Sequence, residues 1–173
     1  MLVALVLVVF PFCMVFAAIS DMLSMTIANR VALLLVANFL LVAPLTGMPW
    51  DAFVWHIAAG AAVLAVTFGL FALGGMGGGD AKLMSATALY LGIGFNLIEY
   101  LVVSAFLGGV LTVAILMYRK SPISAYTGHN VFLRHFADQQ SGIPYGIALG
   151  VGGLVVYPQT PLMMWAVNIL AWN

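Results

Sequence analysis

Long apolar stretches alternate with short polar breaks along the chain. Six stretches are candidates for membrane-crossing helices, and they cover approximately residues 2–19, 29–46, 53–74, 81–95, 97–118 and 143–158. A hydrocarbon core about 30 Å thick takes roughly 20 apolar residues in a helix. The fourth and sixth stretches are shorter than this, so we expect them to tilt inward or to be extended by their neighbours. The pattern predicts an all-α integral membrane fold of about six transmembrane helices, in a single domain over residues 1–173.

Both ends of the chain are also apolar. The first five residues contain no Lys or Arg, whereas a cleaved signal peptide begins with a positively charged region. We therefore expect residues 2–19 to form a retained helix. The tail 161–172 is too short to span a bilayer, and its Trp165 and Trp172 suit an interfacial position.

Composition supports a lipid environment. Hydrophobic residues make up 65% of the chain and charged residues 6%, whereas soluble proteins carry about 25% charged residues. The mean hydropathy of +1.17 agrees. The formal net charge is zero, so no basic surface is expected for nucleic acid. Cys13 is the only cysteine, which excludes an internal disulfide and a cysteine-based metal site.

The basic residues predict an orientation. With six crossings, all five fall on one face, and they are Arg30, Lys82, Arg119, Lys120 and Arg134. Asp51 and Glu99 fall on the other face. Because basic loops stay on the cytoplasmic side, this placement predicts an external N-terminus and a cytoplasmic loop 119–142.

Two acidic residues stand near helix ends on the predicted cytoplasmic face. Asp21 follows the first apolar stretch and Asp80 precedes the fourth, so two crossings between them return the chain to the same side. Ionisable groups at a membrane are functional candidates by default. Two such carboxylates can share a proton, one accepting a proton from a water and the other donating one to a carbonyl oxygen or a leaving amine.

Other interpretations of these acids remain open. Asp80 would be a good N-cap for the helix that follows it, and Asp21 could be an interfacial residue that helps to end the first helix. A small proton-coupled transporter also uses buried acids and glycine-broken helices, although near the bilayer midplane. A non-catalytic subunit of a secretion or pilus assembly is the third alternative.

A glycine run precedes Asp80. Residues 74–79 read Gly-Gly-Met-Gly-Gly-Gly, and glycine permits close approach to the backbone, as an extended substrate strand would require. The alternative is a flexible turn or a close contact between helices. Lys82 lies two residues after the acid, where its charge could lower a carboxylate pKa or contact substrate. It could equally be a positive-inside anchor.

These motifs resemble those of the type IV prepilin peptidases. Residues 77–82, Gly-Gly-Gly-Asp-Ala-Lys, resemble the GxGD-x-K motif, whose aspartate corresponds to Asp80. Asp21 corresponds to the first catalytic aspartate, which precedes an Ile-Pro-Asn element in the family. Here that element reads Ile27-Ala28-Asn29, with Ala28 in place of proline. Residues 141–148, Ser-Gly-Ile-Pro-Tyr-Gly-Ile-Ala, resemble the PYG-x-A element of the small Tad/Flp-pilus members.

The resemblance implies a minimal GxGD aspartic peptidase of the bacterial inner membrane. Asp21 and Asp80 would be catalytic, while Gly77, Gly78, Gly79 and Lys82 would bind substrate or support the site. The implied partner is a Flp-type prepilin whose leader is cleaved at the cytoplasmic face, with lipid around the enzyme. The chain lacks the paired cysteines and the domain of the larger members, so cleavage without zinc or another cofactor is expected, and N-methylation is not. The resemblance leaves the oligomeric state open.

A second polar cluster has residue types that could bind a metal. It consists of His129, Arg134, His135 and Asp138. The spacing fits no strong zinc pattern, so we expect a solvated loop and no metal.

Overall fold

The computed structural model describes residues 1–122, 136, 138 and 142–172, and the regular elements in this part of the chain are all helical. They are α1 (Leu2–Ser24), α2 (Asn29–Leu45), α3 (Trp50–Ala72), α4 (Gly78–Leu91), α5 (Phe95–Lys120), α8 (Gly146–Val156), the 3-10 turn η1 (Tyr157–Gln159) and α9 (Pro161–Ala171). Each of the six apolar stretches identified in the sequence overlaps one of these helices. The prediction of an all-α fold is confirmed for the described residues.

The number of spans is supported only in part. Three helices are long and apolar enough to cross a membrane, namely α1, α3 and α5, and a fourth span is possible if α8–η1 and α9, which bend by 53°, count as one. At 1.5 Å per residue, the 17 residues of α2 measure about 26 Å and the 14 residues of α4 about 21 Å. The described residues therefore support a multi-pass protein with three to four candidate spans, and six spans remain a prediction.

Helix α4 differs from its predicted bounds for local reasons. It begins at Gly78, inside the glycine run, and ends at Leu91, because Gly92 has a φ of 67° that continues no helix. The prediction of 81–95 was therefore displaced at both ends. Apart from Lys82, every residue of α4 from Ala81 to Leu91 is buried. A helix that is buried on all sides need not meet lipid, which explains why so short a helix suffices here.

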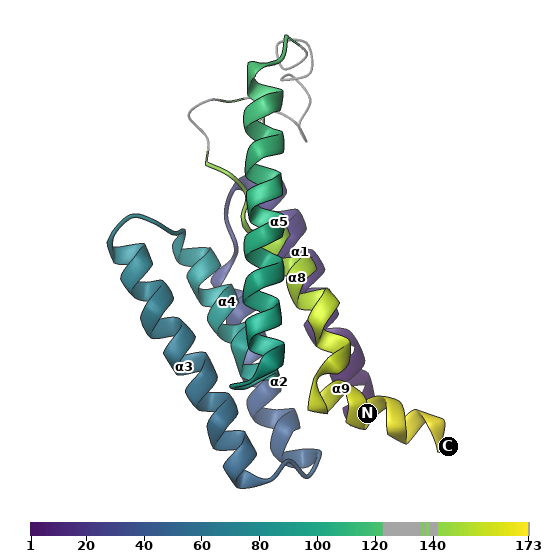
Figure 1. Cartoon of the computed structure of the whole chain (residues 1–173). Helices are drawn as coiled ribbons and strands as arrows, with labels where there is room; N and C mark the ends of the chain where they lie inside the picture. Colours follow the sequence, from purple (N-terminus) through teal and green to yellow (C-terminus); the bar gives the residue numbers. More distant parts are fainter. Residues whose placement is uncertain (123–135, 137, 139–141, 173) are drawn as a thin grey trace.

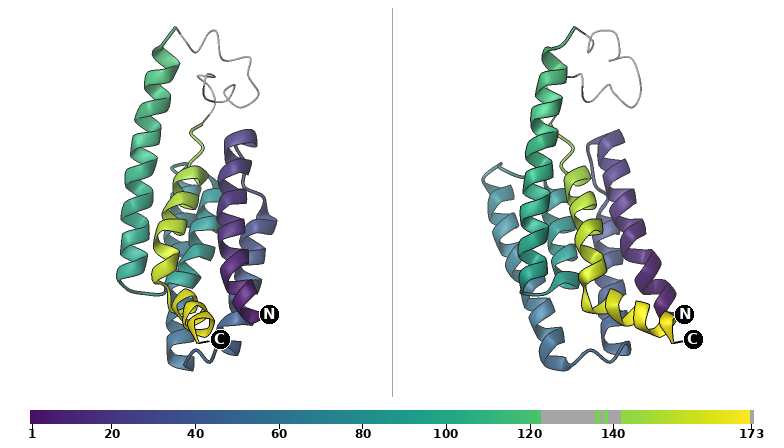
Figure 2. Two further views of the ribbon diagram at one scale, coloured as in Figure 1. Left: turned by 90° about the vertical axis from the view of Figure 1, so that its right-hand side faces the viewer. Right: turned by 45° about the vertical axis from the view of Figure 1, so that its right-hand side comes forward.

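The other helices surround α4. It packs against α3, α2 and α8, while α1 packs against α2 and α8, and α5 packs on α8. Figure 1 shows α4 behind α5, with α3 at the outer edge. Both termini lie at one end of the bundle, and α5 projects beyond the other helices at the opposite end (Figure 2).

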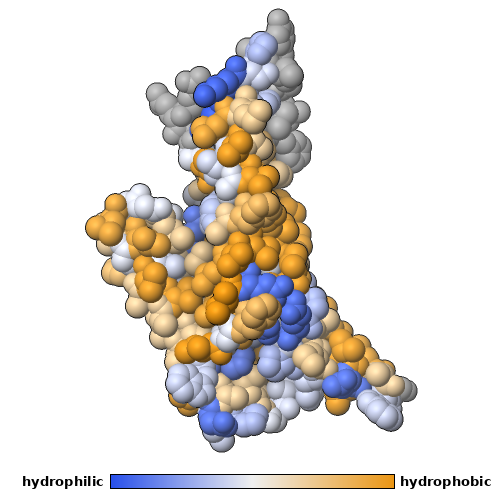
Figure 3. Space-filling view, viewed as in Figure 1, coloured by the Kyte–Doolittle hydropathy of each residue, from blue (hydrophilic) through white to orange (hydrophobic). Residues whose placement is uncertain are grey.

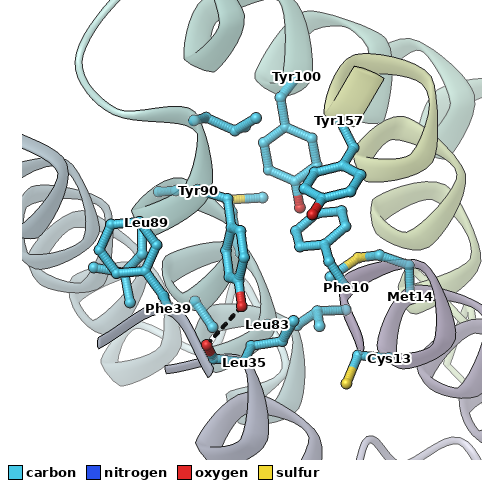
Figure 4. Packing of buried hydrophobic residues seen from close by; sticks show 14 of the residues in the cluster. Phe10, Cys13, Met14, Leu35, Phe39, Leu83, Leu89, Tyr90, Tyr100 and Tyr157 are labelled. Atoms are coloured by element: carbon cyan, nitrogen blue, oxygen red, sulfur yellow. Dashed lines mark hydrogen bonds between the residues drawn. The ribbon is translucent and has the colours of Figure 1, made fainter. Parts of the chain in front are cut away.

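The core is rich in aromatic rings (Figure 4). Phe10 of α1 stacks on Tyr157 with ring centroids 4.1 Å apart and lies 4.7 Å from Tyr90 of α4. Each tyrosine hydroxyl donates to a backbone carbonyl, Tyr157 to Val6 at 2.6 Å and Tyr90 to Leu35 at 2.9 Å. The rings thus tie α4 and the end of α8 to the first two helices.

On the face shown in Figure 3, apolar residues cover much of the bundle, with hydrophilic residues at its ends and in one patch in its lower half. Phe68 of α3 and Val102 and Phe106 of α5 are among the large side chains that point outward. Such exposure is unsuited to water and fits lipid.

Charged residues lie toward the ends of the bundle. The described basic residues stand where α2 and α4 begin and where α5 ends, and these are Arg30, Lys82, Arg119 and Lys120. Asp51 and Glu99 stand at the opposite end, where α3 and α5 begin.

Candidate active site

Asp21 lies in the last turn of α1, which continues to Ser24, beyond the predicted end. The chain turns sharply at Met25, whose φ is 54° and whose N–H bonds the Asp21 carbonyl at 2.8 Å. Hydroxyl groups support the turn, with Ser24 Oγ donating to the Ser20 carbonyl at 2.7 Å. Asp21 itself is 6% exposed. The turn therefore leaves a carboxyl group buried at one end of the bundle.

Asp80 lies in the first turn of α4. The N-cap is Gly77, so the interpretation of Asp80 as the N-cap is wrong. From the third helical position its carboxylate reaches back to accept from the Gly77 N–H, as in half of a capping box. Its Oδ1 is buried and has no hydrogen-bond partner among the described residues. One oxygen of Asp80 is thus left available.

The two carboxyl groups are close enough to affect each other. Burial, and next the charge of Asp21, raise the pKa of Asp80 to about 7, while the Gly77 N–H opposes the shift. Burial and the Asp80 charge also raise the pKa of Tyr145, which immediately precedes α8. Asp21, Asp80 and Tyr145 therefore share one electrostatic neighbourhood, although the two acids are 59 positions apart in sequence.

Helix α8 supplies a direct partner for Asp21. The backbone N–H of Gly146 donates to Asp21 Oδ2 at 2.7 Å. Tyr145 fixes the chain just before it, because its ring packs over Gly108 of α5 and its hydroxyl donates to the Ser104 carbonyl at 3.2 Å. Three separate segments thus meet at the acids.

The glycines before Asp80 are needed for contact rather than for unusual backbone angles. In residues 74–79 only Gly74 has positive φ. A Cβ added at Gly79 would lie 3.1 Å from the Ile27 Cβ, and one added at Gly77 would lie 2.7 Å from Asp80 Oδ2. At Gly78 the nearest neighbour is the ring of Phe71, at 3.2 Å. The glycines therefore let the start of α4 pack against the turn between α1 and α2.

Lys82 is directed away from the acids. At 100° per residue it lies about 200° around the helix from Asp80, and its Nζ donates to Asn29 Oδ1 at 2.8 Å. Both residues stand at one end of an apolar groove of about 690 Å³ between α2, α3 and α4. Neither aspartate lines this groove.

The residues considered for a metal site lie largely outside the described chain. This applies to His129, Arg134 and His135, whereas Asp138 is described. Within the described residues no three His, Cys, Asp or Glu side chains gather as a metal site.

Comparison with known proteins places the chain in a family. The family model described as the type IV leader peptidase family matches residues 8–116, which is more than half of the chain and includes both aspartates. This chain belongs to the type IV leader peptidase family. No curated protein and no solved structure matches it. The family assignment made from the motifs is confirmed, and a peptidase activity of the leader-peptidase kind follows from it.

Sequence reasoning missed part of the site of this leader peptidase. The Pro144-Tyr145-Gly146 segment was noted as a motif, but neither Tyr145 nor Gly146 was given a role. It also lies outside the matched residues 8–116. A backbone N–H can come from any residue except proline, so its involvement leaves no signal in side-chain chemistry. The available signal was a glycine at the start of a helix.

Proposed function

We propose that this leader peptidase is an aspartic endopeptidase in which Asp21 and Asp80 activate a water. The observation that carries the proposal is the pair of neighbouring carboxyl groups at one end of the bundle, where the pKa of Asp80 is raised to about 7 by burial and by the Asp21 charge. A pair that holds one proton near neutral pH provides a base and an acid together. The base removes a proton from water as it adds to the peptide carbonyl, and the acid protonates the carbonyl oxygen.

We further propose that the substrate is a Flp-type prepilin and that cleavage occurs at the cytoplasmic face of the bacterial inner membrane. Supporting this orientation, the described basic residues stand at the same bundle end as the acids, while Asp51 and Glu99 stand at the other. In this arrangement the N-terminus is external. Helices α2 and α4 would complete six crossings as short helices that depend on their neighbours. A leader ahead of an apolar helix would meet the acids at the membrane surface.

The decisive experiment compares four variants in membranes with a Flp-type prepilin. Asp21→Asn and Asp80→Asn are each expected to abolish leader removal, because an amide cannot take the proton from water or supply one. Asp51→Asn and Glu99→Gln serve as matched controls at the other end of the bundle and should process normally. Processing is measured by the gel shift of the prepilin at equal membrane abundance of each variant.

Each outcome distinguishes the alternatives. Near-normal processing by Asp21→Asn or Asp80→Asn would remove that residue from the mechanism. No processing by wild type or by any variant is the result expected of a non-catalytic assembly subunit. Proton-dependent flux through reconstituted vesicles, lost in the same two variants without any prepilin cleavage by wild type, would instead indicate a transporter.

A further inference from the structure

The Gly146 N–H is directed at a buried carboxylate. Gly146 is the first residue of α8, and the first N–H groups of a helix have no partner within it. They also lie at the positive end of the helix dipole. The distance of 2.7 Å to Asp21 Oδ2 is typical of a bond to an ionised oxygen. It is the one hydrogen bond to the Asp21 side chain among the described residues.

The glycine is what permits this approach. A Cβ at position 146 would lie 2.9 Å from Asp21 Cβ and Oδ2 and 2.8 Å from Ile27 Cδ1. Any larger residue would push the helix end away from the acid or displace the acid itself. Glycine at this position therefore brings a donor, without a side chain, against Asp21.

Asp80 has a different environment. The Gly77 N–H favours its anion, but Oδ1 is buried without a partner in the described chain. A buried carboxyl oxygen without a donor is costly as an anion, and protonation lowers this cost because it removes the buried charge. The Gly146 N–H therefore favours the ionised form of Asp21, whereas the surroundings of Asp80 favour its protonated form.

We propose that Gly146, through its backbone N–H, makes Asp21 the ionised member of the pair and leaves the shared proton on Asp80. This rests on the proposed function and assigns the roles within it. Asp21 takes a proton from the water as the C–O bond forms, and Asp80 gives its proton to the carbonyl oxygen. When the C–N bond breaks, Asp21 passes its proton to the leaving amine and Asp80 regains its own from the hydroxyl. Gly146 is a positioning residue, because it touches Asp21 and not the substrate.

The basic groups nearest in sequence to the site have other environments. Lys82 is on the opposite face of α4 and bonds Asn29. Arg30 of α2 lines a groove with Phe12 and Phe16 of α1. Arg119, from the end of α5, donates to the Gly142 carbonyl.

The remaining titratable groups near these helices lie either at another place in the bundle or close to Asp80. The charge of Asp80 acts on Tyr100 of α5 and on Tyr145, which precedes α8. The Tyr145 hydroxyl donates to the Ser104 carbonyl. His56 of α3 bonds the Leu89 carbonyl at the far end of α4. The Gly146 N–H thus remains the group of positive character in contact with Asp21.

The test removes the N–H while adding no side chain. Replacing the amide by an ester also weakens the Tyr145 carbonyl as the acceptor of the Leu149 N–H, and an ester control at the next linkage weakens its own carbonyl in the same way. Glycolic acid is incorporated at position 146 during cell-free synthesis into nanodiscs, which replaces the amide N–H by an ester oxygen. The matched control is the equivalent ester at Ile147, whose N–H bonds the Pro144 carbonyl rather than a carboxylate. A second pair is Gly146→Ala with Gly142→Ala, because a Cβ at Gly142 would meet only Met25, at 3.5 Å. Cleavage rates of a Flp-type prepilin are measured from pH 4 to pH 10.

The expected result is a shift of the acidic limb of the rate profile to higher pH. A bond to a charged group stabilises it enough to move this limb by about one to two pH units. The 146 ester should therefore be slow at neutral pH and recover toward alkaline pH, while the Ile147 ester keeps the wild-type profile. Gly146→Ala should shift in the same direction, and Gly142→Ala should not.

Two results would overturn the proposal. One is an equal loss of rate at every pH in the 146 ester, which would make Gly146 a packing residue. The other is failure of this ester to accumulate when the Ile147 ester does, because the N–H would then serve folding. The proposed function fails separately, through cleavage by Asp21→Asn or Asp80→Asn.

Discussion

Two parts of the bundle bury polar side chains, and they do so differently. In the middle, Asn38 Nδ2 donates to the Tyr90 hydroxyl at 3.0 Å, and that hydroxyl donates to the Leu35 carbonyl at 2.9 Å. At the end of the bundle, Asp80 retains a buried oxygen without a partner among the described residues, beside the buried Asp21. Asn38, Tyr90 and Leu35 thus form a chain of hydrogen bonds between α2 and α4, whereas Asp80 Oδ1 accepts no hydrogen bond from the described residues.

The difference separates groups that hold helices together from groups that are ready to react. A satisfied buried network stabilises one arrangement of the helices. Glu99 Oε2 is also buried without a partner among the described residues, so an unpaired oxygen alone does not mark a reacting group. Asp80 differs because the charge of a second buried carboxyl, Asp21, helps to raise its pKa, and such a destabilising pair persists where a reaction uses it. The following substitutions test this contrast, beginning with the largest expected effect.

Gly79→Val should reduce cleavage about 100-fold, the scale of a 1 Å displacement of reacting groups. The added Cβ meets Ile27, and the branched side chain cannot turn away within the first turn of α4. Asp80, one residue on, would move relative to Asp21. Prepilin processing at matched abundance measures the effect.

The control is Gly75→Ala in the same glycine run, where an added Cβ meets only the Leu70 carbonyl, at an ordinary 3.5 Å. It should process normally. Equal activity of Gly79→Val and wild type would show that the run is a linker and that its contact with Ile27 has no function.

Tyr90→Phe should lower the stability of the fold and leave the rate of cleavage nearly unchanged, which is the reverse of the effect expected for Gly79→Val. It leaves the Asn38 amide and the Leu35 carbonyl without their partner, which costs about 1–3 kcal/mol. Thermal unfolding of the purified protein should occur at lower temperature, and cleavage per folded molecule should stay near wild type. Phe106→Leu, on an exposed aromatic residue of α5, is the control for a change of ring outside the core. If Tyr90→Phe lost cleavage without losing stability, Tyr90 would not belong with the polar groups that only hold the helices together.

Asp80→Asn should be about as stable as wild type at pH 4 and more stable at pH 8. The folded protein raises the pKa of Asp80 to about 7, whereas an unfolded chain has an ordinary value of about 3.9. The folded state therefore binds the proton more tightly, so stability is greatest below about pH 4 and falls as the pH rises toward 7. Asparagine removes this loss, and a difference of about 2–4 °C in midpoint corresponds to 1 kcal/mol for a chain of this size.

Midpoints measured between pH 4 and pH 9 check the sign. Asp51→Asn, an exposed acid at the other end of the bundle, controls for a general effect of lost charge. A wild-type midpoint that rises with pH over this range, or a gap that narrows toward pH 8, would contradict the buried, protonated state of Asp80.

The sequence predicted the helices well, and it predicted that Asp21 and Asp80 lie at the same end of the bundle, for a physical reason in each case. Apolar runs report burial in lipid or core directly, so the positions of α1, α3 and α5 followed. Counting crossings brought Asp21 and Asp80 to one face without any knowledge of packing. Both inferences depend on properties that side chains carry individually.

The features that were missed depend on the backbone and on packing. Glycine is a poor helix former, so the start of α4 at Gly78 could not be read from propensity, and it follows from contact with Ile27. Because Ile93 and Phe95 are apolar, the hydrophobic pattern did not show where α4 ends. The backbone angle of Gly92 sets this end. The bond from Gly146 to Asp21 joins residues 125 positions apart through a backbone group, and no side-chain pattern encodes it.

Lys82→Met should have the smallest effect, and it tests whether the reacting set extends beyond Asp21 and Asp80. Lys82 is exposed and points to Asn29, on the face of α4 opposite Asp80. An exposed contact of this kind contributes about 0.2–1 kcal/mol, so cleavage should fall by no more than about fivefold, and the acidic limb of the rate profile should stay in place. Lys120→Met, which removes a basic residue from the same bundle end, controls for changes in membrane orientation. A 100-fold loss confined to Lys82→Met, or a displaced acidic limb, would mean that this charge acts on the carboxyl pair in spite of its direction. Lys82 would then belong with the groups that react, and the glycine run would serve to bring its charge as well as Asp80 to the site.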